Sequence, residues 1–179
     1  MSVKPWYSIR ARGARAAEVS IYGDIGESWS EESVTAAKFV REIGALDVEE
    51  LTVRINSFGG SVSDGLAMYN AIKRHKAAVT VSIDGIAASI ASLVAMAGDT
   101  VEMAENALLM IHAPWGAAIG NSAAMREFAD TLDTWAAAMA TSYAAKTGRD
   151  QAEMLALLSD GQDHWYSAEE ARDAGFADT

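Results

Sequence analysis

The amino-acid sequence predicts an α/β fold built around a parallel sheet, and two observations lead to this prediction. Short apolar runs with strand character recur along the chain, and stretches with helical spacing lie between them. Strands and helices also alternate in order, which is the pattern of parallel sheets whose strands are joined by crossover helices. The predicted strands are Glu18–Tyr22, Leu51–Asn56, Val79–Asp84, Thr100–Met103 and Leu108–His112.

The helices are predicted from capping residues and from apolar side chains three and four positions apart. A Ser followed three positions later by Glu forms a capping box, which satisfies free backbone N–H groups at the start of a helix. Glycine often ends a helix because it tolerates a left-handed backbone. The predicted helices run from about Ser28 to Gly44, Val62 to His75, Ser122 to Lys146, Gln151 to Leu158, and from the cap at Ser167 to the residue before Gly175.

The longest of these helices carries a continuous apolar stripe along one side. We expect most of the stripe to pack on its own domain, and the alternative is that part of it faces another subunit. Its members are Met125, Phe128, Leu132, Trp135 and Met139.

The composition is that of one globular domain over residues 1–179. Half of the residues are apolar, the formal net charge is −11, and there are no cysteines to form disulfides or thiolate metal sites. Such an acidic surface repels phosphate backbones, so nucleic acid is not an expected partner. The longest apolar stretch, 85–97, is too short to cross a bilayer, and residues 1–15 lack the pattern of a leader peptide. We therefore expect a cytoplasmic protein without membrane contact.

Two strand-to-helix junctions contain the residue types that acyl-transfer chemistry needs. In the first, Gly59 and Gly60 allow a tight turn or the close approach of another chain. In the second, small residues surround Ser89, and the helix N-terminus with the amide of Ile90 would favour an oxyanion. From the residues alone, Ser89 and Ser92 are equal candidates for a nucleophile.

A serine nucleophile needs a base, and the chain has three histidines. His112 ends a buried apolar run, where catalytic groups are commonly held. His75 is expected to be a solvated surface residue, and His164 has no predicted strand to bring it to a site. The acid that orients the imidazole is either Asp160 or Asp163, and spacing does not decide between them. No histidines have metal-ligand spacing, so no metal site is expected.

Four segments of the sequence resemble, in order, the motifs of the ClpP-like serine peptidases. They are INSFGGSVSDG, GIAASIAS, LLMIHAP and DHWYSAEEARDAGFAD, and the resemblance covers about 18–178. It implies the ClpP/crotonase-like fold of repeated strand–helix units with a long handle helix. It also implies that Ser89 is the nucleophile, His112 the base and Asp163 the acid. The oxyanion donors would be the backbone amides of Gly59 and Ile90.

The resemblance further implies polypeptide substrates, a homo-oligomer of stacked rings and no cofactor. An extended peptide would add main-chain hydrogen bonds along two segments that flank the site. The handle that joins two rings in relatives corresponds here to about 113–146. The implied substrate-binding residues are Gly60, Ser61, Val62, Ala113 and Pro114.

Two departures from the family pattern indicate a subtype. Bacterial housekeeping members carry Pro where Phe58 stands, and residues 1–17 are unlike the axial loops that engage an AAA+ unfoldase ring. The chain is more similar to the ClpP-like proteases encoded in phage and prophage head-assembly regions. That similarity implies capsid or scaffold protein as the substrate, and it leaves an unfoldase partner open.

Three alternatives are weighed against this hypothesis. A crotonase-like acyl-CoA enzyme shares the general fold, but it normally has an acid in its active site and CoA favours a basic rim. A Ser–Lys peptidase needs a lysine near the serine, and Lys73, Lys76 and Lys146 lie in no matching motif. A catalytically silent ring subunit would keep the fold without the chemistry.

Overall fold

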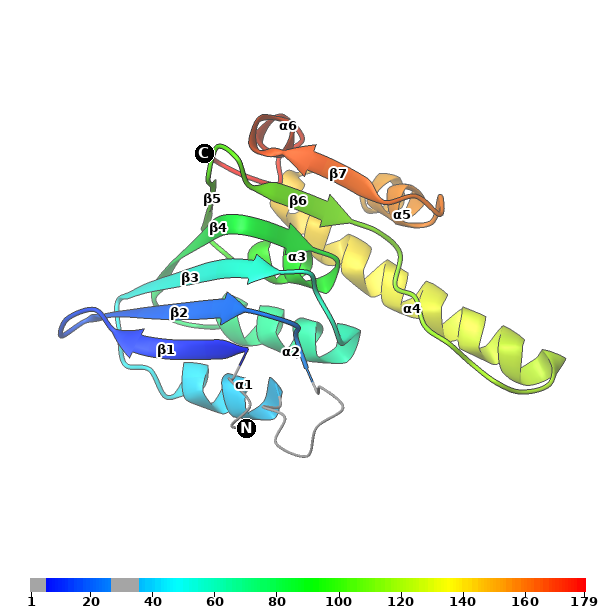
Figure 1. Cartoon of the computed structure of the whole chain (residues 1–179), viewed down its shortest axis with the longest axis horizontal. Helices are drawn as coiled ribbons and strands as arrows, with labels where there is room; N and C mark the ends of the chain where they lie inside the picture. Colours follow the sequence, from blue (N-terminus) through cyan, green and yellow to red (C-terminus); the bar gives the residue numbers. More distant parts are fainter. Residues whose placement is uncertain (1–5, 27–35) are drawn as a thin grey trace.

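The computed structural model describes residues 6–26 and 36–179, and the structural statements below refer to these residues. Seven strands form one sheet in the order β1-β2-β3-β4-β6-β7, with β5 paired to β4 (Figure 1). The strands are β1 Tyr7–Ala11, β2 Ala16–Tyr22, β3 Glu50–Ser57, β4 Ala78–Ala88, β5 Thr100–Met103, β6 Leu108–Ile111 and β7 His164–Ser167. The helices are α1 Ala36–Gly44, α2 Val62–Lys73, α3 Ile90–Ala95, α4 Ser122–Thr147, α5 Gln151–Leu158 and α6 Ala168–Asp173.

The centre of the sheet is parallel, as the alternation of strands and helices predicts. Strands β2, β3 and β4 pair in parallel, and β4 continues in parallel with both β5 and β6. Strand β4 serves two neighbours because its first half pairs with β5 and its last three residues pair with β6. The predicted α/β class is therefore confirmed.

Both edges of the sheet are antiparallel strands that the sequence pattern did not predict. Strand β1 pairs with β2, and β7 pairs with β6 with Ile111 opposite His164. His164 is the first residue of β7, a strand that the sequence did not predict, and its Nε2 contacts Asp160. Both strands are short and only partly buried, so their pairing partners define them more than their own apolar pattern.

One face of the sheet is covered by α1, α2 and α3, and the core lies between (Figure 1). The strands present alternate side chains to this core, and Val53, Ile55 and Val81 are fully buried. Burying each such side chain stabilises the fold by about 1.5–3 kcal/mol relative to leaving it exposed. This packing fixes the ends of β3 and β4, where the candidate site residues stand.

The opposite face carries a polar network that aligns the central strands. The Arg54 guanidinium donates to both carboxylate oxygens of Asp84, at 2.8 and 2.5 Å. The Tyr22 hydroxyl donates to the same carboxylate, and this hydrogen bond raises the pKa of Tyr22. The network therefore ties β2, β3 and β4 together on the side that these helices do not cover.

Helix α4 extends away from the rest of the molecule (Figure 1). It is capped by Asn121, whose side chain accepts from two backbone N–H groups, and by Gly148 in the left-handed conformation with φ 71°. Of the stripe residues, Met139 is buried, and Met125 is 44% exposed. The expectation that the stripe packs on its own chain therefore holds at the C-terminal end of α4 and fails at Met125.

The remaining predicted elements agree closely with the structure. The capping box at Ser167 is present, since its hydroxyl accepts from the backbone N–H of Glu170 and its backbone N–H donates to that carboxylate. The predicted helix start at Ser28 lies outside the described residues. Within 6–26 and 36–179, no helix combines the length and apolar character needed to cross a membrane.

Candidate active site

Ser89 occupies a sharp turn between β4 and α3. Its backbone has φ 54° and ψ −133°, and it is the one non-glycine residue at positive φ in the part of the chain that the structure describes. Such a conformation costs about 1–3 kcal/mol and persists only where the surroundings enforce it. The backbone N–H of Ser89 donates to the carbonyl of Met110 at 3.0 Å, which fixes the turn to β6. This strained strand–turn–helix is the geometry of a nucleophile elbow, although the usual G-x-S-x-G sequence is absent.

Two glycines give the elbow its space. Gly59 has φ +105°, and a Cβ added to it would lie 2.7 Å from Cβ of Ser89. A Cβ added to Gly65 on α2 would lie 2.1 Å from Cγ1 of Ile90, the residue that follows Ser89. Both contacts are shorter than carbon atoms tolerate, so glycine is required for the elbow to pack against the β3–α2 segment.

The structure brings Ser89, His112 and Asp163 into one hydrogen-bonded chain. The Nε2 atom of His112 lies 2.7 Å from Oγ of Ser89, and its Nδ1 atom lies 3.0 Å from Oδ1 of Asp163. Because the carboxylate only accepts, the neutral imidazole carries its proton on Nδ1 and its Nε2 accepts from the serine hydroxyl. His112 follows directly after β6 and Asp163 directly precedes β7, so the antiparallel pairing of these strands sets their distance.

The two candidate acids have different partners. Asp160 accepts from the backbone N–H of Gln162 at 2.8 Å and lies 3.1 Å from Nε2 of His164. The hydrogen bond from Gln162 lowers the pKa of Asp160, and His164 adds to this effect. Asp163 contacts His112 instead, so the structure separates two residues that spacing left equal.

The two candidate serines also differ. Ser92 is fully buried, and its hydroxyl lies 2.6 Å from the carbonyl oxygen of Ser89 and 2.8 Å from the hydroxyl of Tyr143. A peptide carbonyl has no path to such an atom. Ser89 is the serine that contacts His112.

The predicted oxyanion donors lie on either side of the elbow. Ile90 begins α3, where the first N–H groups of a helix have no partner within the helix. The N–H of Gly59 donates to the hydroxyl of Ser57 at 3.1 Å.

The predicted peptide-binding segments are only partly open. Ile25 pairs with the glycine-rich segment: its N–H donates to the carbonyl of Gly59 at 2.7 Å, and its carbonyl accepts from Ser61 at 2.8 Å. Gly60 forms a parallel bridge with Ile25, and Val62 begins α2. Across the site, Ala113 and the buried Pro114 follow His112 without regular secondary structure.

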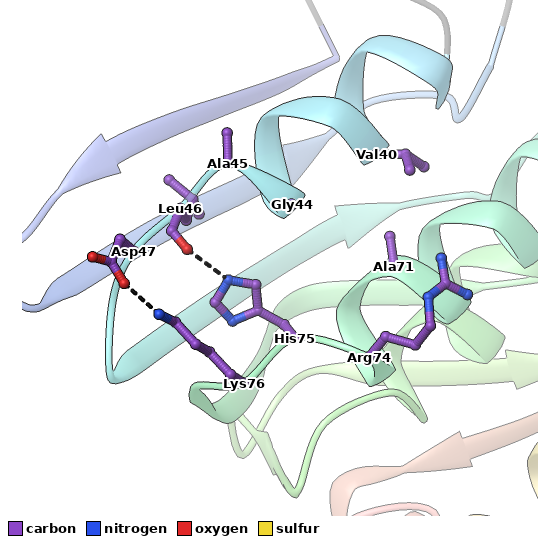
Figure 2. Close-up of a pocket in the computed structure, with 9 residues that line it drawn as sticks. All are labelled: Val40, Gly44, Ala45, Leu46, Asp47, Ala71, Arg74, His75 and Lys76. Atoms are coloured by element: carbon purple, nitrogen blue, oxygen red, sulfur yellow. Dashed lines mark hydrogen bonds and ion pairs between the residues drawn. The ribbon is translucent and has the colours of Figure 1, made fainter.

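His75 lies apart from this site and is not the solvated residue that the sequence predicts. It is half-buried in a pocket between the ends of α1 and α2, which no member of the Ser–His–Asp chain lines (Figure 2). Its Nδ1 accepts from the N–H of Ala77 at 3.1 Å, so its Nε2 donates to the carbonyl of Leu46 at 3.2 Å. Its role there is to tie two loops together.

Within the described residues, no group of three or more His, Cys, Asp or Glu side chains is arranged to hold a metal ion.

A serine, a histidine and an aspartate joined in this order at a strand–helix junction form the arrangement of serine hydrolases. The sequence also matches the profile of the Clp protease family over residues 2–179. The chain therefore belongs to the Clp protease family, which is a family of peptidases.

Individual relatives agree with this assignment. The chain is 32% identical over 177 residues to an ATP-dependent Clp protease proteolytic subunit of Leuconostoc citreum (strain KM20), covering 96% of this chain and 86% of the relative. It is 33% identical over 134 residues to a protein of the same name from Pleurastrum terricola, covering 74% of this chain and 67% of that relative.

Proposed function

We propose that this protein is a serine endopeptidase that cleaves peptide bonds through an acyl-enzyme. The observation that carries the proposal is the pair of contacts made by His112, 2.7 Å to Oγ of Ser89 and 3.0 Å to Oδ1 of Asp163. Membership of a peptidase family supports the same chemistry.

In the proposed reaction, Nε2 of His112 removes the proton of Ser89 while Oγ attacks the substrate carbonyl. Asp163 stabilises the resulting imidazolium and keeps the imidazole in the required orientation. His112 then gives the proton to the leaving amine, and water hydrolyses the acyl-enzyme by the reverse sequence of proton transfers. The amides of Gly59 and Ile90 stabilise the negative oxygen, and Gly59 releases the Ser57 hydroxyl to do so.

The substrate is proposed to lie as an extended peptide between two segments. On one side it would use Gly60, Ser61 and Val62, and on the other Ala113 and Pro114. Because Ile25 already holds one edge of the Gly60 segment, the peptide must approach from the opposite edge.

The active form is proposed to be a ring-shaped homo-oligomer in which α4 and the segment before it contact another subunit. In the single chain, Trp115 is 76% exposed and Ile119 is fully exposed, and the N-terminal half of α4 lies in solvent. Large apolar side chains are costly to leave in water, which favours a protein partner for this surface. The proposed natural substrates are capsid or scaffold proteins of a phage or prophage. The alternative to this phage role is that the protein works with an AAA+ unfoldase as its partner.

The test is fluorophosphonate labelling with mass-spectrometric mapping, together with short-peptide hydrolysis and native mass. We expect labelling at Ser89 in the wild type and a loss of several orders of magnitude with His112→Ala. His75→Ala is the matched control, because His75 lies in the separate pocket of Figure 2 and should label normally.

Each contrary outcome has a defined meaning. Labelling at another serine would refute the nucleophile assignment. No labelling in a well-formed ring would refute the enzyme proposal in favour of a structural ring subunit. Binding of an acyl-CoA at the same site without peptide hydrolysis would favour the crotonase-like alternative.

A further inference from the structure

The elbow that presents Ser89 rests on a second, buried set of hydroxyl groups. Ser92 Oγ lies 2.6 Å from the carbonyl oxygen of Ser89, and the Tyr143 hydroxyl lies 2.8 Å from the same Oγ. A carbonyl oxygen only accepts, so Ser92 must donate to Ser89 and use its lone pair to accept from Tyr143. We call these two hydrogen bonds the hydroxyl relay. Its direction is fixed: Tyr143 donates to Ser92, and Ser92 donates to the backbone carbonyl of Ser89.

Neither hydroxyl group can exchange its partner for solvent. Ser92 and Tyr143 are both fully buried, and burial raises the pKa of the Tyr143 hydroxyl so that it remains a donor. The Tyr143 ring is held edge-on against Phe176, with ring centroids 6.0 Å apart. A buried hydroxyl that loses its partner is left unsatisfied, which makes this hydrogen bond hard to break.

The relay ends on the carbonyl group of Ser89, the residue with the strained backbone conformation. The carbonyl of Ser89 accepts from both the N–H and the Oγ of Ser92, at 3.0 and 2.6 Å, while the N–H of Ser89 is held by Met110 at 3.0 Å. With φ 54°, the Ser89 peptide would relax to an ordinary conformation if these bonds were removed. Relaxation would turn Oγ of Ser89 away from Nε2 of His112.

We propose that Ser92 and Tyr143 are positioning residues that hold the Ser89 elbow in its attacking conformation, an inference that rests on the proposed peptidase function. Tyr143 belongs to the C-terminal part of α4, so the relay also joins this helix to the backbone of the nucleophile. Its effect is on the rate of bond formation at Ser89, and it leaves substrate affinity unchanged.

The test compares Tyr143→Phe and Ser92→Ala by the kinetics of fluorophosphonate labelling, separating the inactivation rate constant from the binding constant. Misplacing a nucleophile by about 1 Å lowers a rate by roughly 100-fold, so we expect a fall of roughly 10- to 100-fold in the rate constant alone. Tyr143→Phe keeps the ring against Phe176 and removes only the donor. The double variant should be no slower than Ser92→Ala, because both changes interrupt one relay.

Two further variants separate positioning from simple loss of stability. Ser92→Thr restores the hydroxyl and should recover most of the rate. Tyr69→Phe removes the hydroxyl of another buried tyrosine, on α2, and should leave the rate constant at the wild-type value. Unchanged rate constants in Tyr143→Phe and Ser92→Ala, or a fall that only follows the melting temperature and is not recovered by Ser92→Thr, would overturn the proposal.

Amide hydrogen exchange over 88–95 gives a readout that does not depend on activity. We expect exchange to become roughly tenfold faster in Tyr143→Phe, as for the loss of one hydrogen bond, and to stay unchanged in Tyr69→Phe. If the wild type is not labelled by the fluorophosphonate, the peptidase proposal is wrong. If Tyr143→Phe and Tyr69→Phe show equal hydrogen exchange over 88–95, the proposed positioning role of Ser92 and Tyr143 is refuted independently of the peptidase proposal.

Discussion

Gly65→Ala is predicted to destabilise the protein, against the usual effect of replacing a glycine inside a helix. Alanine in a helix interior is normally favoured over glycine by up to about 1 kcal/mol. Here the new Cβ would lie 2.1 Å from Cγ1 of Ile90 and 3.2 Å from its Cβ, and Ile90 is fully buried. Overpacking a core costs about 1–3 kcal/mol, and a contact this short belongs in the upper part of that range. The net loss is therefore about 1–2 kcal/mol.

The assay is thermal unfolding at one fixed protein concentration, because the proposed assembly would make the melting temperature depend on concentration. For a chain of this length the expected fall in melting temperature is about 2–8 °C. Gly44→Ala is the matched control: Gly44 ends α1, and a Cβ there meets no atom within 4 Å. It should be neutral or slightly stabilising.

A Gly65→Ala variant as stable as Gly44→Ala would refute the reasoning, since Ile90 would then be free to move aside at little cost. The same variant also tests the site. Ile90 follows the proposed nucleophile, so its displacement should slow fluorophosphonate labelling of the fraction that remains folded.

The other predictions concern the acid, the pH dependence and the assembly. Asp163→Asn should lower peptide hydrolysis by roughly 10⁴-fold, as for the acid of other triads, whereas Asp160→Asn should change it little; equal losses would contradict the assignment. Burial alone would raise the pKa of Asp178, but its hydrogen bonds from Lys146 and from the backbone lower it below its ordinary value of 3.8. Its stabilising effect is therefore full above that value and is lost as the pH falls through the folded pKa, so Asp178→Asn should flatten the acid side of a melting-temperature profile. Met125→Glu should dissociate the proposed oligomer without unfolding the chain, as measured by native mass and circular dichroism, since this side chain is exposed in the single chain. An intact ring would contradict the proposed α4 contact.

The central strands and the main helices could be predicted because their signals are local. Strand β5 and helix α5 have the predicted bounds, since apolar periodicity and flanking caps suffice for them. Strands β1 and β7 could not be predicted, because each is defined by hydrogen bonds to a distant neighbour in the sheet.

The sequence predicts which residue types form the candidate site, but it does not decide between two candidates of the same type. A serine and a histidine after buried strands pointed to Ser89 and His112. Choosing Ser89 over Ser92 needs the positive φ of one and the complete burial of the other, and neither is visible in an Ala/Ser-rich segment. The proposed role of Tyr143 has no local signal in the sequence, because its hydrogen-bond partner Ser92 lies 51 residues away.

The order in which the site residues occur along the chain has a consequence for synthesis. His112 lies 23 residues after Ser89, and Asp163 lies 51 residues after His112, beside a strand that must pair with β6. A ribosome-bound chain that has not yet released β7 holds a serine and a histidine without the carboxylate that orients them. Under the proposed mechanism, hydrolytic competence therefore requires that Asp163 and β7 have been synthesised and that β7 has paired with β6. A truncated chain that ends before Asp163 should accordingly fail to react with fluorophosphonate even when Ser89 and His112 are intact.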